Sequence, residues 1–148
     1  MTGDPYVIVT TGSRRFTFQP AIRSLLVDVI RNRPTGSPTG APVIVHGACP
    51  DGADTLVDAW ARRQGIRVDP MPADWQAPCR DTCRQGHRRR RKDGVDYCPA
   101  AGVYRNQDMI DVPPCIVVGF LCGPSNGTRD CLRRAVEAKI PVKVWRQW

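Results

Sequence analysis

A chain of 148 residues with 41% hydrophobic side chains is long enough to bury a substantial core, and its length fits one domain. It contains no apolar run near the roughly 20 residues of a membrane span, and its first residues, "MTGDPYVIVTTGS", lack the charged-then-apolar order of a signal peptide. We therefore expect a cytoplasmic protein without a membrane partner. The net charge of +8 favours anionic partners but does not say which ones.

Strands and helices are predicted to alternate along the chain. The strands are expected at 6–10, 42–46, 66–71, 115–121 and 140–145. The helices are expected at 19–33, 53–64, 100–111 and around 132–136. Because the strands are continuous apolar runs, they favour a parallel sheet that is covered on both faces. We predict an α/β protein: a single three-layer Rossmann-like domain over 1–148, with a mainly parallel sheet of about five strands.

Three of the predicted strands end in glycine-rich turns: "TTGSRRF" (10–16), "HGACPDGAD" (46–54) and "CGPSNGTRD" (122–130). Ligands of open parallel sheets bind beyond the carboxyl ends of the strands, and each turn precedes a helix whose N-terminus favours an anion. A turn of this kind is often only a turn, and Asp54 also fits a helix cap. Three such turns at one edge favour a binding site. Neither a Walker A motif nor a full GxGxxG is present, so ATP or NAD binding through those motifs is not supported.

The candidate ligand-binding residues come from these turns and from the segments "PADW" and "RNQDM". They are Gly12, Ser13, Arg14, Gly47, Asp54, Trp75, Arg105, Asn106, Gly123, Ser125, Gly127 and Thr128. Backbone amides of the first and third turns are expected to cradle phosphate, and Arg14 and Arg105 to pair with it. Asn106 is expected to hydrogen-bond a base or ribose. Trp75 can stack on a base or pack in the core.

The turns also carry a family resemblance. "VTTGSRRF", "VHGACPDGADTLVDAWA", "PADW", "AAGVYRNQDMID" and "GPSNGTRDCLRRA" occur in the order seen in the YspA-like, cpYpsA-related branch of the SLOG superfamily. The resemblance runs from about residue 6 to 144. It implies a Rossmann-like fold and a nucleotide or nucleotide-derived ligand. Relatives include the LOG phosphoribohydrolases and the DNA-binding DprA proteins, and many members of the branch occur in bacteriophages, so a phage origin and a location in the host cytoplasm fit.

The resemblance does not extend to LOG-type catalysis. LOG enzymes use a PGGxGTxxE loop and an arginine that Arg105 resembles, but Cys131 stands where the glutamate is expected. A thiol cannot stabilise positive charge developing on a ribose. Other acids near this edge are Asp51, Asp54, Asp74 and Asp130. The catalytic residues therefore stay unknown, and we expect binding without turnover, as a sensor or a phage sponge; a phosphoribohydrolase-like hydrolase is the alternative.

A cysteine-rich stretch interrupts the resemblance at 76–99. Within it, the spacing C-x3-C-x3-H-x10-C joins Cys79, Cys83, His87 and Cys98. Three thiolates and an imidazole complete a tetrahedral zinc site, and a stretch this polar needs a metal to fold. We predict a structural Zn²⁺ in a zinc-knuckle-like insertion; the alternative is reduced cysteines in a disordered loop. Because the insertion leaves after Trp75 and returns before Arg105, it is expected at the rim of the pocket, as a lid or wall.

The insertion also concentrates charge. It holds seven positive and three negative side chains, and the difference of +4 is half of the net charge. The arginines can attract a polyphosphate ligand, bind nucleic-acid phosphates, or form a solvated surface. We place nucleic acid below a nucleotide-derived small molecule as the partner, and we expect a homo-oligomer.

Overall fold

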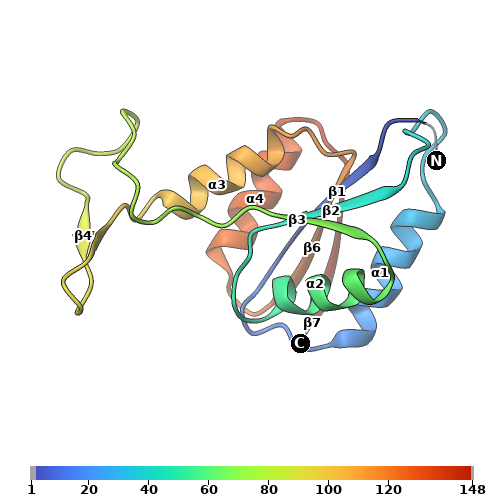
Figure 1. The fold of residues 1–148 in the computed structure, drawn as a ribbon, viewed down its shortest axis with the longest axis horizontal. Coiled ribbons are helices and arrows are strands. Elements are labelled where there is room, and N and C mark those ends of the chain that lie inside the picture. Colours follow the sequence, from blue (N-terminus) through green and yellow to red (C-terminus); the bar gives the residue numbers. More distant parts are fainter. Residues whose placement is uncertain (1–2, 148) are drawn as a thin grey trace.

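The computed structural model describes residues 3–147, which form a five-stranded sheet with helices on both faces (Figure 1). The strands are β1 (Tyr6–Gly12), β2 (Pro42–His46), β3 (Arg67–Pro70), β6 (Ile116–Cys122) and β7 (Val142–Gln147). The helices are α1 (Gln19–Arg31), α2 (Ala53–Arg63), α3 (Ala101–Ile110) and α4 (Asn126–Glu137). The sheet order is β3-β2-β1-β6-β7, and every neighbouring pair is parallel. The predicted Rossmann-like α/β fold is confirmed.

The continuous apolar strands are explained by two cores, one on each face of the sheet. Side chains that alternate along a strand point to opposite faces. Tyr6 and Ile8 of β1 therefore pack against α1 and α2 on one face of the sheet. Val9 points to the other face, where it packs with α3 and α4. Both faces exclude water, so no polar alternation appears in the sequence of the central strands.

The path of the chain places a crevice at one edge of the sheet. From β1 the chain runs outward through β2 to β3, then crosses back to β6 on the other side of β1. The strand order reverses between β1 and β6, and open α/β sheets bind ligands at such a switch point. The turns after β1, β2 and β6 meet at this edge, where α2 and α4 begin.

The insertion at 76–99 forms its own two-stranded antiparallel pair, β4 (Arg89–Arg90) and β5 (Asp96–Tyr97). Figure 1 shows this hairpin extending away from the sheet, beyond the N-terminal end of α3. This pair was not predictable from the sequence, because strands of two residues are too short to show a hydrophobic pattern.

The longest helix in residues 3–147 is α1, with 13 residues, and none of the helices there has the length and apolar character to cross a bilayer.

Candidate functional site

A cavity of about 620 Å³ lies at the carboxyl ends of β1, β2 and β6. It is lined by the turns after these strands, by the segment before the insertion and by α3. All of the predicted ligand-binding residues line it except Gly123, which is exposed in the turn after β6. The fold thus gathers residues as far apart in sequence as Gly12 and Thr128 around one space, although ligand contact by each of them stays a prediction.

Two buried polar atoms on the wall have no partner among residues 3–147. Asp54 is only 6% exposed; its Oδ2 accepts a hydrogen bond from the Cys49 amide at 3.1 Å, but its Oδ1 accepts none. Thr10, which the sequence analysis missed, likewise leaves its Oγ1 unpaired. Burial raises the pKa of the Asp54 carboxyl. A buried polar atom without a partner is costly, so each would gain from a ligand hydroxyl group, which a small shift of the wall must first admit, because the atoms expose almost no surface.

The N-terminus of α4 opens toward the same cavity. Ser125 is its N-cap residue, but the Ser125 hydroxyl donates to Thr128 Oγ1 at 2.8 Å instead of capping the helix. Within the described chain, the amides of Asn126, Gly127 and Thr128 therefore have no acceptor. Unpaired first-turn amides and the helix dipole favour an anion at this position.

Arg105 reaches the cavity from α3. Its Nη1 donates to the carbonyl of Gly47 and, at 3.4 Å, to that of Met71, while its Nε donates to Asn106 Oδ1. No acceptor for Nη2 occurs in residues 3–147, which leaves two N–H groups for a ligand. A Cβ at position 47 would lie 2.5 Å from Arg105 Nη1, so replacing Gly47 would force the guanidinium to shift from this position.

The charge of the wall is positive. Arg14, Arg15 and Arg105 line the cavity, and Asp54 is the one acidic residue among its lining side chains. Arg15 was not singled out from the sequence, although it directly follows Arg14. Three guanidiniums against one carboxyl group favour an anionic ligand.

Ser13 connects the turn after β1 to β6 and to the start of α2 through hydrogen bonds. Its amide donates to the Phe120 carbonyl at 2.9 Å, its Oγ accepts from the Cys122 amide at 2.9 Å, and its carbonyl accepts from the Ala53 amide. The Ser13 amide is therefore already paired with β6 and is not free to bind phosphate, while phosphate binding by the amides around Gly12–Ser13 stays a prediction. The next two amides, those of Arg14 and Arg15, have no acceptor in the described residues and can take that role.

Asn106 is also engaged within the protein. Its Nδ2 donates to the Gly127 carbonyl at 3.1 Å and to Asp130 Oδ2 at 3.0 Å, and its Oδ1 accepts from Arg105. These contacts favour a positioning role, in which Asn106 holds the start of α4 and the Arg105 guanidinium in place. Direct contact with a base or ribose stays a prediction.

The remaining acids do not supply a second carboxylate to the wall. Burial raises the pKa of Asp130, but hydrogen bonds from Arg134 and Asn106 outweigh it and lower that pKa. Asp130 lies outside the cavity lining, as do the exposed Asp51 and Asp74. Cys131 packs in the core with α3 and α4, where burial raises the pKa of its thiol to about 11.

His46, at the end of β2, has a partner that the sequence did not show. Its Nδ1 accepts from the Ala48 amide at 2.9 Å, so its Nε2 carries the hydrogen that is donated to Asp58 Oδ2 at 2.7 Å. The imidazole thereby holds Ala48 in a left-handed backbone conformation, with a φ of 56°. Its role is to shape the turn after β2.

Trp75 lies between the cavity and the insertion. Its side chain is 40% exposed, so it is not a core residue, and it lines the cavity. Its carbonyl accepts from the Cys98 amide at 2.8 Å, and its ring meets the edge of Tyr97 with centroids 6.3 Å apart. An exposed indole on the wall is able to stack on a base.

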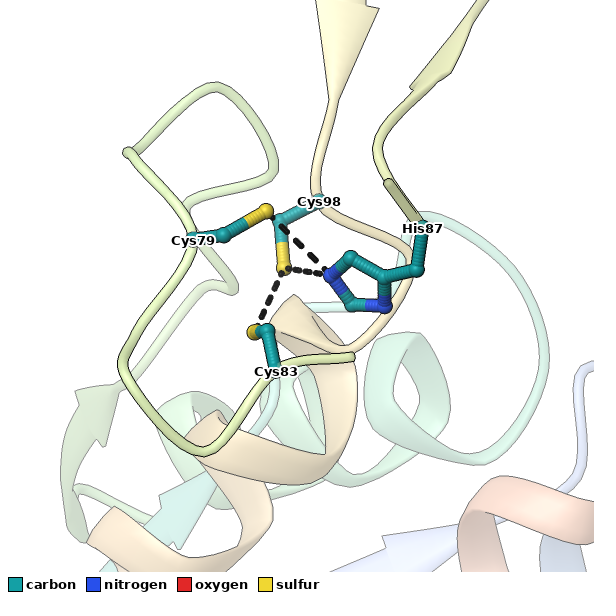
Figure 2. Close-up of side chains that lie close together, drawn as sticks. All are labelled: Cys79, Cys83, His87 and Cys98. Atoms are coloured by element: carbon teal, nitrogen blue, oxygen red, sulfur yellow. Dashed lines mark hydrogen bonds between the residues drawn. The ribbon is translucent and has the colours of Figure 1, made fainter. Parts of the chain in front are cut away.

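The four predicted metal ligands converge, as Figure 2 shows. Their ligand atoms all lie within 4.8 Å of one another. The Cys83 and Cys98 sulfurs are 3.7 Å apart, and His87 Nε2 lies 3.2 Å from Cys79 Sγ and 3.5 Å from Cys98 Sγ. Metal bonds of about 2.3 Å to sulfur and 2.0–2.1 Å to nitrogen place tetrahedral ligands about 3.8 Å (S–S) and 3.5 Å (S–N) apart. The cluster is therefore compatible with a metal site.

Donors surround this cluster. The Tyr104 hydroxyl lies 2.7 Å from Cys83 Sγ, and Arg88 contacts Cys79 Sγ at 3.8 Å while donating to the carbonyls of Gln76 and Ala77. Such outer contacts orient metal ligands. Neither donor was assigned to the cluster from the sequence: Arg88 directly follows His87, whereas only the fold brings Tyr104 of α3 to the cysteines. Tyr104 serves the cluster and the next residue, Arg105, serves the cavity.

The insertion is not a lid or wall of the cavity. None of residues 76–99 lines it. The expectation was wrong because adjacency in sequence, to Trp75 on one side and α3 on the other, fixes only the base of the insertion, and its hairpin extends away from the sheet (Figure 1).

Comparison with known proteins agrees with this architecture. A model of the family described as "YspA, cpYpsA-related SLOG family" matches residues 6–77, which include β1, β2 and the turns that follow them. The chain is also similar to the Gene 61 protein of Mycobacterium phage D29, with 32% identity over 140 residues, covering 91% of this chain and 92% of the phage protein. With a relative of this identity along nearly its whole length, the chain belongs to the YspA, cpYpsA-related SLOG family.

Proposed function

We propose that the protein binds a nucleotide or nucleotide-derived molecule, ADP-ribose-like or cyclic, in the cavity and holds it without cleaving it. Membership of the SLOG family suggests a nucleotide-related ligand. The observation that carries the proposal is the combination, in one cavity, of unengaged anion donors with the unpaired carboxylate oxygen of Asp54. Phosphate and ribose present the complementary groups.

The phosphate is assigned to the side of the cavity formed by α4 and Arg105. The open amides of 126–128 and the free Nη2 of Arg105 are both donors, and a guanidinium pairs well with phosphate oxygens. The amides of Arg14 and Arg15 extend this donor set across the mouth of the turn after β1.

The sugar and the base are assigned to the other polar and aromatic groups of the cavity wall. Asp54 Oδ1 and Thr10 Oγ1 would take hydroxyl groups of a ribose, since both are buried on the wall without partners. Trp75 would stack on the base, and base–aromatic stacking contributes about 1–3 kcal/mol.

The acidic residues near the cavity favour retention of an intact ligand, because they leave no carboxylate free for cleavage. Cleavage of an N-glycosidic bond needs a carboxylate beside the ribose. Cys131 is a buried neutral thiol, and Asp130 is held by Arg133, Arg134 and Asn106. Asp54 alone remains on the wall, and we assign it to hydroxyl binding. A protein that binds without cleaving acts as a sensor of its ligand or as a sponge that lowers the free concentration.

The insertion is proposed to bind Zn²⁺ through Cys79, Cys83, His87 and Cys98. Cysteine-rich tetrahedral sets favour zinc, and four protein ligands leave no position for a catalytic water. The metal would therefore organise residues 76–99 within the domain and take no part in chemistry.

The test mixes purified protein with a panel of mononucleotides, cyclic nucleotides, NAD and ADP-ribose, and separates bound from free by filtration. Chromatography with mass spectrometry then identifies both fractions, before and after heat denaturation. We expect one ligand class to be depleted from solution and recovered intact. A released base would overturn retention and turn attention to Asp54. No depletion across the panel would overturn binding itself.

A further inference from the structure

The basic side chains of the insertion fall into two groups. Three are in ion pairs: Arg80 with Asp108, Arg88 with Asp96, and Arg91 with Asp93. The others have no carboxylate partner within residues 3–147; they are Arg84, Arg89, Arg90 and Lys92. All four are exposed, and Asp81 is the one acid of the insertion that is also unpaired there. The hairpin therefore presents an excess of unneutralised positive charge.

This charge lies outside the lining of the nucleotide cavity. None of the four residues lines that cavity, and the hairpin extends away from the sheet (Figure 1). Arg84 and Arg89 instead line a separate open hollow on the insertion, together with Gln85, His87 and Arg88. Several guanidiniums around one hollow, on an element that projects from the sheet, form a surface that an extended polyanion can contact.

The chemistry of this surface selects the phosphate backbone of a nucleic acid over a lipid bilayer. Guanidinium groups bind phosphate oxygens through paired hydrogen bonds, and a two-stranded ribbon is narrow enough to enter a major groove. Basic membrane-binding elements also insert apolar side chains. The exposed large apolar residues of the described chain all lie outside 76–99, at Phe18, Trp75, Val112, Val136 and Val144.

We infer that the hairpin, organised at its base by the cysteine–histidine cluster, is a docking surface for nucleic-acid phosphates, independent of base sequence. Binding of this kind depends on counterion release, so its strength is set by the number of phosphates contacted and by salt. The surface and the cavity are separate, so the protein can bind nucleic acid at the first and a small molecule at the second at the same time. Failure of one would leave the other intact.

The test measures fluorescence anisotropy of labelled 30-mer single-stranded DNA, duplex DNA and single-stranded RNA with the full-length, zinc-loaded protein. If three or four phosphates are contacted, affinity for the duplex should fall about 40- to 150-fold between 50 and 200 mM salt. Preference among the three probes identifies the kind of nucleic acid. No binding at 50 mM salt, or binding only to phosphatidylserine vesicles run in parallel, would overturn the inference.

A matched pair of variants separates the hairpin from the general charge of the protein. Arg84, Arg89 and Arg90 are changed to Gln in one variant, and the exposed, unpaired Arg23, Arg31 and Arg63 of α1 and α2 in the other. Each loses three charges. The hairpin variant should bind at least tenfold more weakly, with a salt slope lower by about two to three, while the control changes less than twofold. Equal loss in both variants would refute docking at the hairpin; zinc content and melting temperature establish that both are folded.

Discussion

The cavity and the insertion are held together by different forces, although α3 connects them. The cavity wall is built largely of turns anchored on β1, β2 and β6, the strands whose side chains are mostly buried on both faces of the sheet. The insertion has almost no core: Cys98 is its one buried residue, and its order depends on the cysteine–histidine cluster and a few arginine contacts. The pocket is thus shaped by burial of strand side chains, whereas we propose that the charged insertion is organised by metal ligation.

Removing the proposed Zn²⁺ should produce the largest difference in order between the insertion and the sheet. Structural zinc sets supply about 10 kcal/mol or more in small domains, and the insertion has little else. With a chelator, or in Cys79→Ser/Cys83→Ser, we expect trypsin to cut rapidly within 80–92. The circular dichroism of the sheet and its melting transition should change little.

Reconstitution provides the control for that experiment. One Zn²⁺ per chain should restore protection from trypsin, and Co²⁺ should give the absorption of a tetrahedral thiolate site. Loss of the whole melting transition on chelation would contradict the division into two regions, because the sheet would then depend on the metal as well.

Arg105→Ala should be the most damaging single change in the cavity. It removes the guanidinium whose Nη2 we assign to phosphate, and charge-assisted hydrogen bonds contribute about 1.5–3 kcal/mol each. We expect affinity for the ligand found in the panel to fall at least tenfold, measured by calorimetry. Protection of the insertion from trypsin should be unchanged.

A double-mutant cycle with Gly47 tests the same contact from the other side. Gly47→Ala alone should weaken binding with little change in melting temperature, because the new Cβ displaces the Arg105 guanidinium, which is the end of a flexible side chain. In Gly47→Ala/Arg105→Ala there is no guanidinium to displace, so the two effects should not add. Full additivity would show that the two residues act separately.

Trp75→Ala probes the boundary between the regions. If the indole stacks on a base, affinity should fall by about 1–3 kcal/mol. Because the ring is 40% exposed, little stability should be lost. Trp60→Phe, at a buried tryptophan on α2, is the contrasting control: it should lower stability and leave affinity unchanged.

Asp54→Asn should have the smallest effect of these substitutions, and its effect on stability should depend on pH. Burial raises its pKa, so the folded protein binds the proton more tightly than the unfolded chain does. Its contribution to stability therefore falls as the pH rises from about 3.9, the usual pKa, through the raised pKa, and stays low above it. Urea unfolding should show Asp54→Asn more stable than the wild type at pH 7, with the difference shrinking at pH 4, while ligand affinity falls.

The fold was predictable because its signals are local. Uninterrupted apolar strands at 42–46 and 115–121, each followed by a glycine-rich turn and a helix, are sufficient to predict a parallel sheet with ligands at one edge. The four metal ligands were predictable for a similar reason, since their spacing within twenty residues carries the pattern. Long-range partners left no such pattern: nothing in the sequence pairs Ser13 with Cys122 or His46 with Asp58.

By itself the sequence determined the layers, the edge that carries the turns and the cysteine–histidine set, because periodicity and spacing are properties of neighbouring residues. Only the tertiary structure decided which groups are free. It engaged the Ser13 amide and the Asn106 side chain, left Asp54 Oδ1 unpaired and kept the arginines of the insertion out of the cavity lining. The physical reason is that a hydrogen-bonding group is available to a ligand only when no other part of the folded chain has already satisfied it.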